Sequence, residues 1–161
     1  MGVRIEVSIA KQILTLTKAS GESVSWPVST AKNGVGERQG SGCTPRGSHQ
    51  IRIKIGEGLV ANTVFIGRRP TGEIYDANLG DQFPERDWIL TRILWLSGTD
   101  VGFNRGGQRD TQRRYIYIHG TPDSEPMGRP LSHGCIRMRN QDLIELFDQV
   151  DAGTPVQISE T

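Results

Sequence analysis

Alternation of apolar and polar residues dominates the first third of the chain and predicts β-strands. Apolar side chains occupy every second position in four runs bounded by turn-forming residues: 5–9, 14–16, 24–28 and 51–55. Other stretches are typical of buried strands or of a closing strand: 63–66, 88–96, 115–119 and 154–158. Strands with one apolar face must pack against another layer. The pattern therefore predicts a mainly β protein, built as a sandwich or a barrel.

One segment near the C-terminus has helical rather than alternating periodicity. Its apolar stripe is formed by four residues at helical spacing: Leu143, Ile144, Phe147 and Val150. Asn140 is the expected N-cap, and Gly153 follows the expected end. We therefore expect one main C-terminal helix over 141–150, packed on a single β-sandwich-like domain that spans 1–161.

Composition places the chain among ordinary globular proteins. It has 161 residues, of which 35% are hydrophobic and 23% are charged. This is enough to build a core without disulfides or metals. Nineteen Lys and Arg against eighteen Asp and Glu give a net charge of +1. Binding to nucleic acid or to an anionic membrane surface through global charge is therefore not expected.

No segment has the pattern of a signal peptide or of a membrane helix. The longest mostly apolar stretch, 88–96, is far shorter than the ~20 residues that cross a bilayer, and it contains Arg92. The expected location is the cytoplasm, or the periplasm if a leader precedes Met1 in the full gene. The two cysteines, Cys43 and Cys135, form no C-x-x-C motif and no disulfide framework.

Two short segments carry the residue types that sulfur-based acyl transfer requires. His119 ends an expected strand, on the face opposite Ile116 and Ile118, and Cys135 follows sixteen residues later. A nearby imidazole can take the thiol proton, giving a thiolate–imidazolium pair that is nucleophilic at neutral pH. Gly134 allows the backbone N–H groups beside Cys135 to converge on an oxyanion. These residues predict a nucleophilic cysteine.

Simpler interpretations of the same residues stay open. A lone cysteine such as Cys135 is also typical of a small buried hydrophobe, and His133 of a satisfied polar residue. His119, His133 and Cys135 together are three potential zinc ligands, although an i, i+2 pair across glycine is a poor zinc motif. His49 lies in a strand pattern, where a structural role is expected. The glycine-rich stretch 34–42 lacks the ending of a phosphate-binding loop and is predicted to be a loop beside the site.

Arginine is concentrated around these two segments. Residues 101–139 hold seven arginines and three acids, whereas the rest of the chain has a small acidic excess. Guanidinium groups are well suited to bind carboxylates or phosphates. Solvated surface charge is the simpler interpretation for most of these side chains individually, and the excess gains interest from the two segments that lie within it.

The segment Ser132-His-Gly-Cys-Ile-Arg137, with His119-Gly-Thr upstream, resembles the catalytic signature of the L,D-transpeptidase catalytic-domain family. Further similarity covers the family's opening hairpin, its next strand, its Thr-Pro-x-Gly turn and its closing strand: 9–16, 27–30, 43–47 and 153–158. The stretch 57–114 matches least well. The resemblance implies a β-sandwich-like catalytic domain that needs no cofactor and no metal.

The resemblance also implies roles for individual residues. Cys135 is the nucleophile and His119 its base, with the Gly120 carbonyl orienting the imidazole. The residues that surround the oxyanion and shape the site are Ser132, His133, Gly134 and the backbone of Cys135. Arg137 shapes the site or binds a substrate carboxylate, and Cys43 is incidental.

The implied substrate is a peptidoglycan tetrapeptide or muropeptide that forms a thioester with Cys135, and a carbapenem is expected to form an adduct there. Water as the acceptor gives an L,D-carboxypeptidase that releases D-Ala, whereas an amine gives a 3-3 cross-link. With no leader or wall-binding module expected, we favour the carboxypeptidase of muropeptide recycling over the transpeptidase. A non-catalytic muropeptide-binding module is a third hypothesis, against which the Cys135–His119 pair argues.

Overall fold

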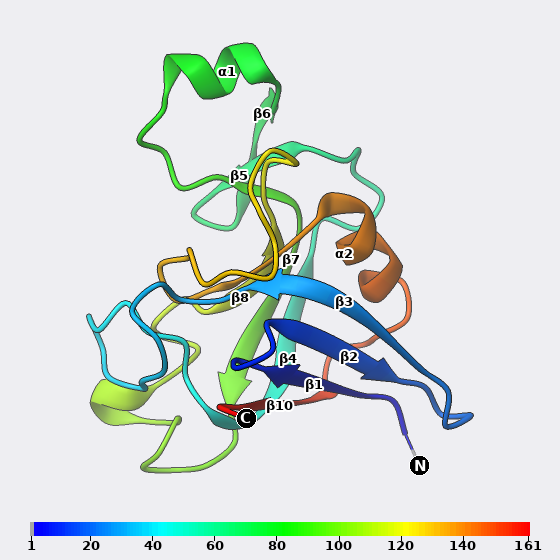
Figure 1. The fold of residues 1–161 in the computed structure, drawn as a ribbon, viewed down its shortest axis with the longest axis vertical. Coiled ribbons are helices and arrows are strands. Elements are labelled where there is room, and N and C mark those ends of the chain that lie inside the picture. The colour runs from blue at the N-terminus through cyan, green and yellow to red at the C-terminus, as the bar shows by residue number, and fades with distance from the viewer. Residues whose placement is uncertain (1) are drawn as a thin grey trace.

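The computed structural model describes residues 2–161 and has a mainly β architecture (Figure 1). The strands are β1 (Arg4–Ser8), β2 (Ile13–Thr17), β3 (Ser23–Ser29), β4 (Gly47–Ile55), β5 (Thr63–Ile66), β6 (Arg69–Ile74), β7 (Ile89–Gly98), β8 (Tyr117–Gly120), β9 (Ile136–Met138) and β10 (Pro155–Ser159). The helices are α1 (Ala77–Gln82), the 3-10 turn η1 (Gly107–Arg109) and α2 (Asn140–Phe147). The predicted mainly β class with one main C-terminal helix is confirmed.

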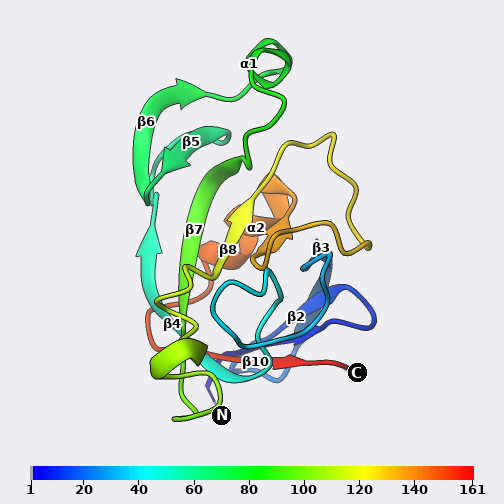
Figure 2. The same cartoon turned by 90° about the vertical axis from the view of Figure 1, so that its left-hand side faces the viewer.

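The strands are joined into one sheet that closes on itself. Its order is β4-β10-β1-β2-β3-β9-β8-β7-β5-β6, and an additional pairing joins β4 to β7. That pairing closes eight strands into a ring and leaves β5 and β6 as a hairpin outside it. Strands β1, β2 and β10 cross the direction of β4, β7 and β8 (Figure 2). The ring is therefore flattened into two facing layers, as in a sandwich.

The core lies between these layers and follows the alternation of the sequence. Ile5, Leu14 and Leu16 are at most 1% exposed, whereas the residues between them reach the surface. Helix α2 turns Leu143 and Phe147 into the same cluster, where both are fully buried. Each such side chain contributes roughly 1.5–3 kcal/mol of hydrophobic stabilisation. This core fixes the strands that carry the site.

The start and end of α2 differ from the prediction. The helix ends at Phe147 and leaves the buried Val150 beyond it. The expected N-cap is wrong: Arg139 occupies that position, and Asn140 is the first helical residue. The Asn140 side chain accepts from the Thr91 hydroxyl at 2.5 Å and donates to the Thr121 carbonyl at 3.0 Å. Because these buried partners use the amide, it does not cap the helix.

Two polar elements, β6 and α1, carry no apolar periodicity and were not predicted. No residue of α1 is buried, and its first turn is held by Asp76, which accepts the Leu79 N–H at 2.8 Å.

Two strand boundaries also differ from the prediction. Strand β4 begins at Gly47 and includes His49, whereas β8 begins at Tyr117 because Tyr115 has a φ of 57°. Local turn geometry, rather than hydrophobicity, sets these limits.

Candidate active site

Parallel pairing of β8 with β9 brings the two signature segments side by side. His119 lies directly opposite Arg137 in this ladder. Residues two apart on a strand point to the same face of the sheet, so Tyr117 and His119 share a face. Arg137, which pairs with His119, lies on that face as well. Ile118 points the other way, into the core. The predicted orientation of His119 is therefore confirmed, and Cys135 is placed just before β9, beside Tyr117.

A cavity of about 230 Å³ opens over this face and contains the predicted site side chains. Its lining consists of Asp87, Ile89, Arg114, Tyr115, Ile116, Tyr117, His119, Ser132, His133, Cys135 and Arg137. Three loops and three strands, β7, β8 and β9, thus contribute to one site. Five of these residues were predicted as site residues from the sequence. The other six were not: Asp87, Ile89, Arg114, Tyr115, Ile116 and Tyr117.

The Cys135 thiol is held between two backbone groups. Its sulfur accepts the Tyr117 N–H at 3.3 Å, and its S–H donates to the Tyr115 carbonyl at 3.3 Å. Burial raises the pKa of Cys135 to about 12, a shift that the Tyr117 N–H only partly opposes. The thiol is therefore protonated at neutral pH in the resting protein.

His119 presents a neutral imidazole in a defined tautomer. The residue is 1% exposed, and its Nδ1 lies 2.6 Å from the carbonyl oxygen of Gly120. A carbonyl only accepts, so we assign the ring proton to Nδ1, which leaves Nε2 with a free lone pair. Burial lowers the pKa of His119, more than the Gly120 bond and the charge of Asp87 raise it. The directions of both shifts favour a neutral thiol and a neutral imidazole in the resting protein over the thiolate–imidazolium pair expected from the sequence.

Glycine is required at two positions beside these groups. A Cβ on Gly120 would collide with the Asn140 side chain and with the Leu90 carbonyl oxygen. Gly134 has a φ of 132°, and a Cβ there would lie 3.2 Å from the Cys43 carbonyl oxygen. Close backbone approach therefore explains both glycines.

Ser132 holds the loop that carries the thiol. Its hydroxyl donates to the Cys135 carbonyl at 2.5 Å and accepts the Gly134 N–H at 3.2 Å. The Gly134 N–H is thus occupied, and Gly134 supplies turn geometry rather than the oxyanion donor expected of it. Among residues 2–161, the N–H of Cys135 has no hydrogen-bond acceptor. That N–H is the donor that the loop leaves free beside the sulfur.

Asp87 links two predicted residues, although no sequence signal pointed to it. One carboxylate oxygen accepts from Arg137 Nη2 at 3.0 Å, and the other lies 3.2 Å from His133 Nδ1. Burial raises the pKa of Asp87, but interaction with the His119 and Arg137 side chains and the His133 hydrogen bond bring it below its usual value. Asp87 is therefore ionised, and this half-exposed carboxylate pairs with the mostly buried Arg137 guanidinium.

The glycine-rich loop borders the site, as predicted. Arg114 donates to the Cys43 carbonyl at 2.6 Å, and the Thr44 hydroxyl donates to the Gly134 carbonyl at 2.8 Å. Arg114 also donates to the Gly36 carbonyl at 3.2 Å, so this cavity residue attaches the loop to the segment before β8, whereas Thr44 attaches it to the turn before Cys135. Cys43 contributes its backbone to this contact, whereas its thiol lies near the carbonyl oxygens of Asn33 and Ser41.

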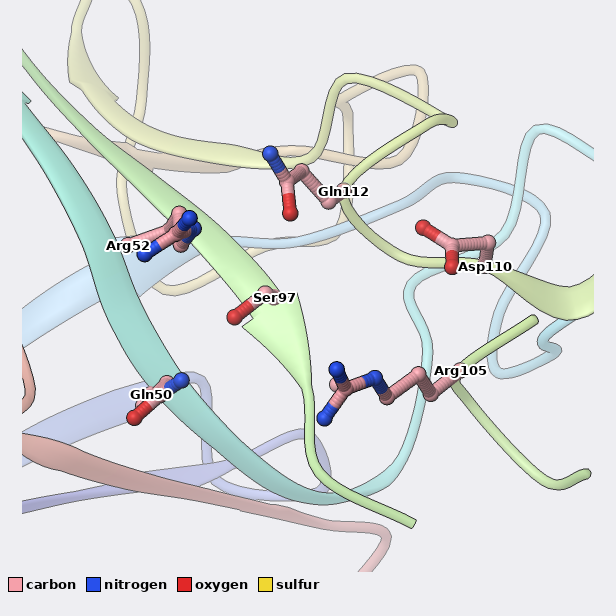
Figure 3. A pocket seen from close by; sticks show the side chains of 7 residues that line it. Gln50, Arg52, Ser97, Arg105, Asp110 and Gln112 are labelled. Carbon is pink, nitrogen blue, oxygen red and sulfur yellow. The ribbon is translucent and has the colours of Figure 1, made fainter. Parts of the chain in front are cut away.

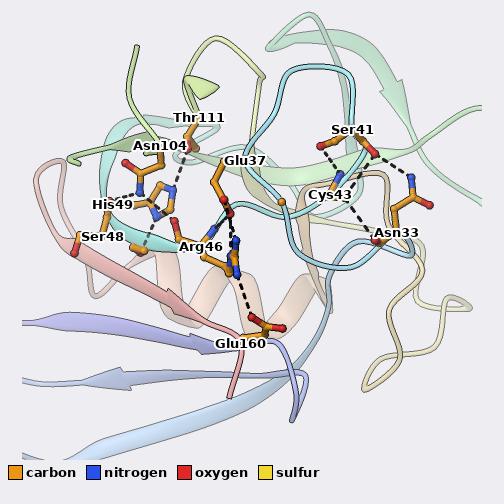
Figure 4. A network of polar contacts seen from close by, with 12 residues as sticks. Asn33, Glu37, Ser41, Cys43, Arg46, Ser48, His49, Asn104, Thr111 and Glu160 are labelled. Atoms are coloured by element: carbon orange, nitrogen blue, oxygen red, sulfur yellow. Dashed lines mark hydrogen bonds and ion pairs between the residues drawn. The ribbon is translucent and has the colours of Figure 1, made fainter. Parts of the chain in front are cut away.

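A polar network anchors the far end of the same loop (Figure 4). The Arg46 guanidinium donates to buried Glu37 at 3.0 Å. His49 contacts the Gly47 carbonyl through Nδ1 and the Thr111 hydroxyl through Nε2, both at 3.0 Å. Burial lowers the pKa of His49 to about 4. His49 is thus a structural residue, as the sequence predicted.

Within residues 2–161, no group of three or more His, Cys, Asp and Glu side chains is arranged to hold a metal ion. His119 and His133 are bonded to Gly120 and Asp87 instead. The zinc alternative therefore gains no support.

No helix within residues 2–161 has the length and apolar character needed to cross a membrane.

A thiol and a fixed imidazole that line the same cavity define a cysteine–histidine site on a mainly β scaffold. The family model "L,D-transpeptidase catalytic domain" (YkuD) matches residues 2–158. The chain belongs to this family.

Individual relatives agree with this assignment. The chain is 45% identical over 99 residues to "Putative L,D-transpeptidase YkuD" of Bacillus subtilis, a match that covers 59% of this chain and 48% of that protein. The fold is similar to L,D-transpeptidase 3 from Mycobacterium tuberculosis, with a TM-score of 0.60 and 17% identity over 99% of this chain and 61% of that one. It is also similar to LdtMt1 in complex with imipenem, with a TM-score of 0.58 and 22% identity over 98% of this chain and 59% of that one. The chain therefore spans about half to three fifths of the length of these proteins.

Proposed function

We propose that the protein is a cysteine acyl-transfer enzyme acting on peptidoglycan stem peptides, with Cys135 as nucleophile and His119 as base. The observation that carries this proposal is the shared cavity of the thiol and of an imidazole whose Nδ1 is held by the Gly120 carbonyl. Membership of the L,D-transpeptidase catalytic domain family supports the class of substrate.

The reaction starts from the neutral pair. As Cys135 Sγ attacks the carbonyl carbon, its proton passes to Nε2 of His119, and a carbon–sulfur bond forms. The oxyanion of the tetrahedral intermediate is placed to accept the free Cys135 N–H. Collapse breaks the carbon–nitrogen bond, and the leaving D-Ala nitrogen takes the proton from His119. The product of this half-reaction is a thioester on Cys135.

Water is the acceptor in the second half-reaction that we favour. His119 takes a proton from water, the hydroxyl attacks the thioester carbon, and the returning proton restores the thiol and releases a tripeptide. A cavity of about 230 Å³ is at the small end of ligand sites and suits one peptide end with a water molecule. Arg137 Nε is buried and has no hydrogen-bond acceptor among residues 2–161, which supports a role in binding a substrate carboxylate.

Transfer to an amine is the second candidate, favoured by a different observation. A neighbouring cavity of about 360 Å³ shares Asp87, His133 and Arg137 with the cysteine cavity and continues past Trp88 and Pro122. An acceptor stem peptide has room there, on the other side of the Asp87–Arg137 pair. This arrangement is suited to L,D-transpeptidase cross-linking.

A product assay separates these candidates. Purified protein is incubated with a soluble tetrapeptide, and free D-Ala, tripeptide and cross-linked dimer are quantified by mass spectrometry. The proposal predicts D-Ala and tripeptide in equal amounts. Dimer as the main product would establish the transpeptidase, and no turnover would favour the non-catalytic binding module. The Cys43→Ala variant serves as the matched control and should retain activity.

The cytoplasmic location expected from the sequence belongs to the same proposal. In this compartment soluble muropeptides are the available substrates, so the enzyme would trim D-Ala during wall recycling. Fractionation of cells that express the natural gene tests the location, and recovery in the periplasm would contradict it.

A further inference from the structure

A second polar cavity, of about 270 Å³, lies away from the cysteine (Figure 3). It opens on the outer face of the β4–β7 ladder, where Gln50 lies opposite Ser97 and their neighbours Ile51 and Leu96 point into the core. The strand side is completed by Arg52 and Gly98, and the loop after β7 supplies Arg105, Asp110 and Gln112. None of these residues lines the cavity of Cys135.

Two arginines bring positive charge to this cavity. Arg52 comes from β4 and Arg105 from the facing loop, and neither forms an ion pair within residues 2–161. Figure 3 shows the Arg105 guanidinium extending from the loop toward the end of β7 and the Ser97 hydroxyl directed toward β4, and both residues line the cavity. Guanidinium groups from two segments are a typical arrangement for binding a carboxylate.

Ser97 supplies an independent sign of a ligand. The residue is 8% exposed, and its Oγ has no hydrogen-bond partner among residues 2–161. Buried hydroxyl groups in folded proteins are normally hydrogen-bonded. An oxygen-bearing ligand in the cavity would satisfy this group.

Asp110 limits which anion fits. Its carboxylate is fixed by the N–H groups of Gly106 at 2.8 Å and Arg113 at 2.9 Å. Burial raises the pKa of Asp110, but these backbone bonds lower it below its usual value, so the group is ionised. One acid beside two arginines leaves a single net positive charge. The cavity therefore favours a monoanion that also carries an N–H donor for Asp110.

We propose that this cavity binds a carboxylate with a nitrogen donor beside it, as in a free amino acid or the C-terminal residue of a peptide. Arg52 and Arg105 bind the carboxylate, Ser97 donates to it, and Asp110 accepts the N–H. The volume suits about one amino-acid residue. This cavity shares no residue with the cavity of Cys135, and its ligand is detected by binding alone. The proposal therefore does not depend on the chemistry proposed for Cys135.

Titrations followed by ¹H–¹⁵N NMR at the amides of Ser97 and Gly98 test the proposal. The probes are alanine, N-acetylalanine as a peptide-end mimic, propionate as the matched compound without nitrogen, and inorganic phosphate. Alanine or N-acetylalanine should give saturable shifts with an affinity at least about tenfold above propionate and phosphate. Which of the two binds more tightly distinguishes a free amino acid from a peptide end. No saturable shift with either, or equal binding of phosphate, would overturn the proposal.

Variants locate the binding. Replacing Arg52→Gln and Arg105→Gln together should weaken the affinity at least about tenfold. Arg69→Gln removes an exposed arginine on β6, outside the cavity, and it should leave the affinity unchanged. If the double variant fails to fold, Arg105→Gln alone, at an exposed loop position, carries the test. Shifts of full size in the arginine variants would contradict the proposed site.

Discussion

The hydroxyl of Ser132 donates to the carbonyl oxygen of Cys135 at 2.5 Å, so a side chain three residues earlier fixes the backbone of the proposed nucleophile. The same hydroxyl also accepts the Gly134 N–H. The first bond is partly buried and the second is buried, so replacement by an apolar group leaves both backbone groups without this partner. Ser132 is thus a positioning residue, and this relationship gives the first prediction.

Ser132→Ala should lower kcat by about tenfold or more, which corresponds to about 1.4 kcal/mol of lost transition-state stabilisation. The expected cause is a displaced Cys135 backbone, since alanine can neither donate to its carbonyl nor accept from Gly134. Steady-state D-Ala release measures the effect. Ser132→Thr keeps a hydroxyl and should recover much of the rate. Wild-type kinetics in the alanine variant would show that this loop does not position the thiol.

The resting Cys135 should behave as a protonated thiol. Burial raises its pKa to about 12, whereas a free cysteine titrates near pH 8.5. In the Cys43→Ala variant, the rate of iodoacetamide alkylation reports Cys135 alone, and it should still be rising at pH 10. A plateau reached below pH 8.5 would instead indicate a stabilised thiolate in the free protein.

Loss of Asp87 should destabilise the fold through Arg137. The Arg137 side chain is only 9% exposed, so Asp87→Asn leaves a mostly buried guanidinium without its counter-charge. Because Asp87 itself is 44% exposed, we expect a decrease of about 1–3 kcal/mol in the free energy of unfolding rather than the full cost of a buried charge. Urea denaturation measures it. The exposed pair Arg4–Glu6 gives the control, since Glu6→Gln should cost less than about 1 kcal/mol.

Acid should destabilise the fold through His49. Its pKa is lowered from 6.5 to about 4, so the folded state holds it neutral while the unfolded chain binds a proton. The stabilisation is complete above pH 6.5 and is lost as the pH falls toward 4, by about 3 kcal/mol at most. In His49→Gln, the free energy of unfolding should decline less steeply over this range. Parallel pH curves for wild type and variant would contradict the assignment.

The parts of the fold that bury alternate side chains were predictable, and the polar parts were not. Apolar alternation around Ile5, Leu14 and Ile51 predicted strands because one face of each lies in the core. Helix α1 and strand β6 bury little apolar surface, so hydrophobicity gave them no signal. The prediction of Asn140 as the N-cap was wrong because its side chain bonds to residues distant in sequence, such as Thr91 on β7.

In the site, too, residues marked by a local motif were predictable, whereas residues brought in by long-range folding were not. Cys135 and His119 were identifiable because their local segments carry a specific motif, and the parallel register of β8 and β9 places them together. Asp87 joins the site only through long-range folding, and nothing in its own neighbourhood marks it. The protonation of the thiol depends on burial, which spacing along the chain does not reveal. Residue types were thus predictable, whereas their electrostatic state required the structure.

Acylation of Cys135 is the central claim, and intact-protein mass spectrometry tests it most directly. The protein is mixed with imipenem, the ligand in the solved complex of the similar enzyme LdtMt1, and in parallel with tetrapeptide under acid quench. The account predicts a single covalent adduct in the wild type and in Cys43→Ala, and none in Cys135→Ala with an unchanged fold. An adduct that persists in Cys135→Ala and disappears in Cys43→Ala would contradict it.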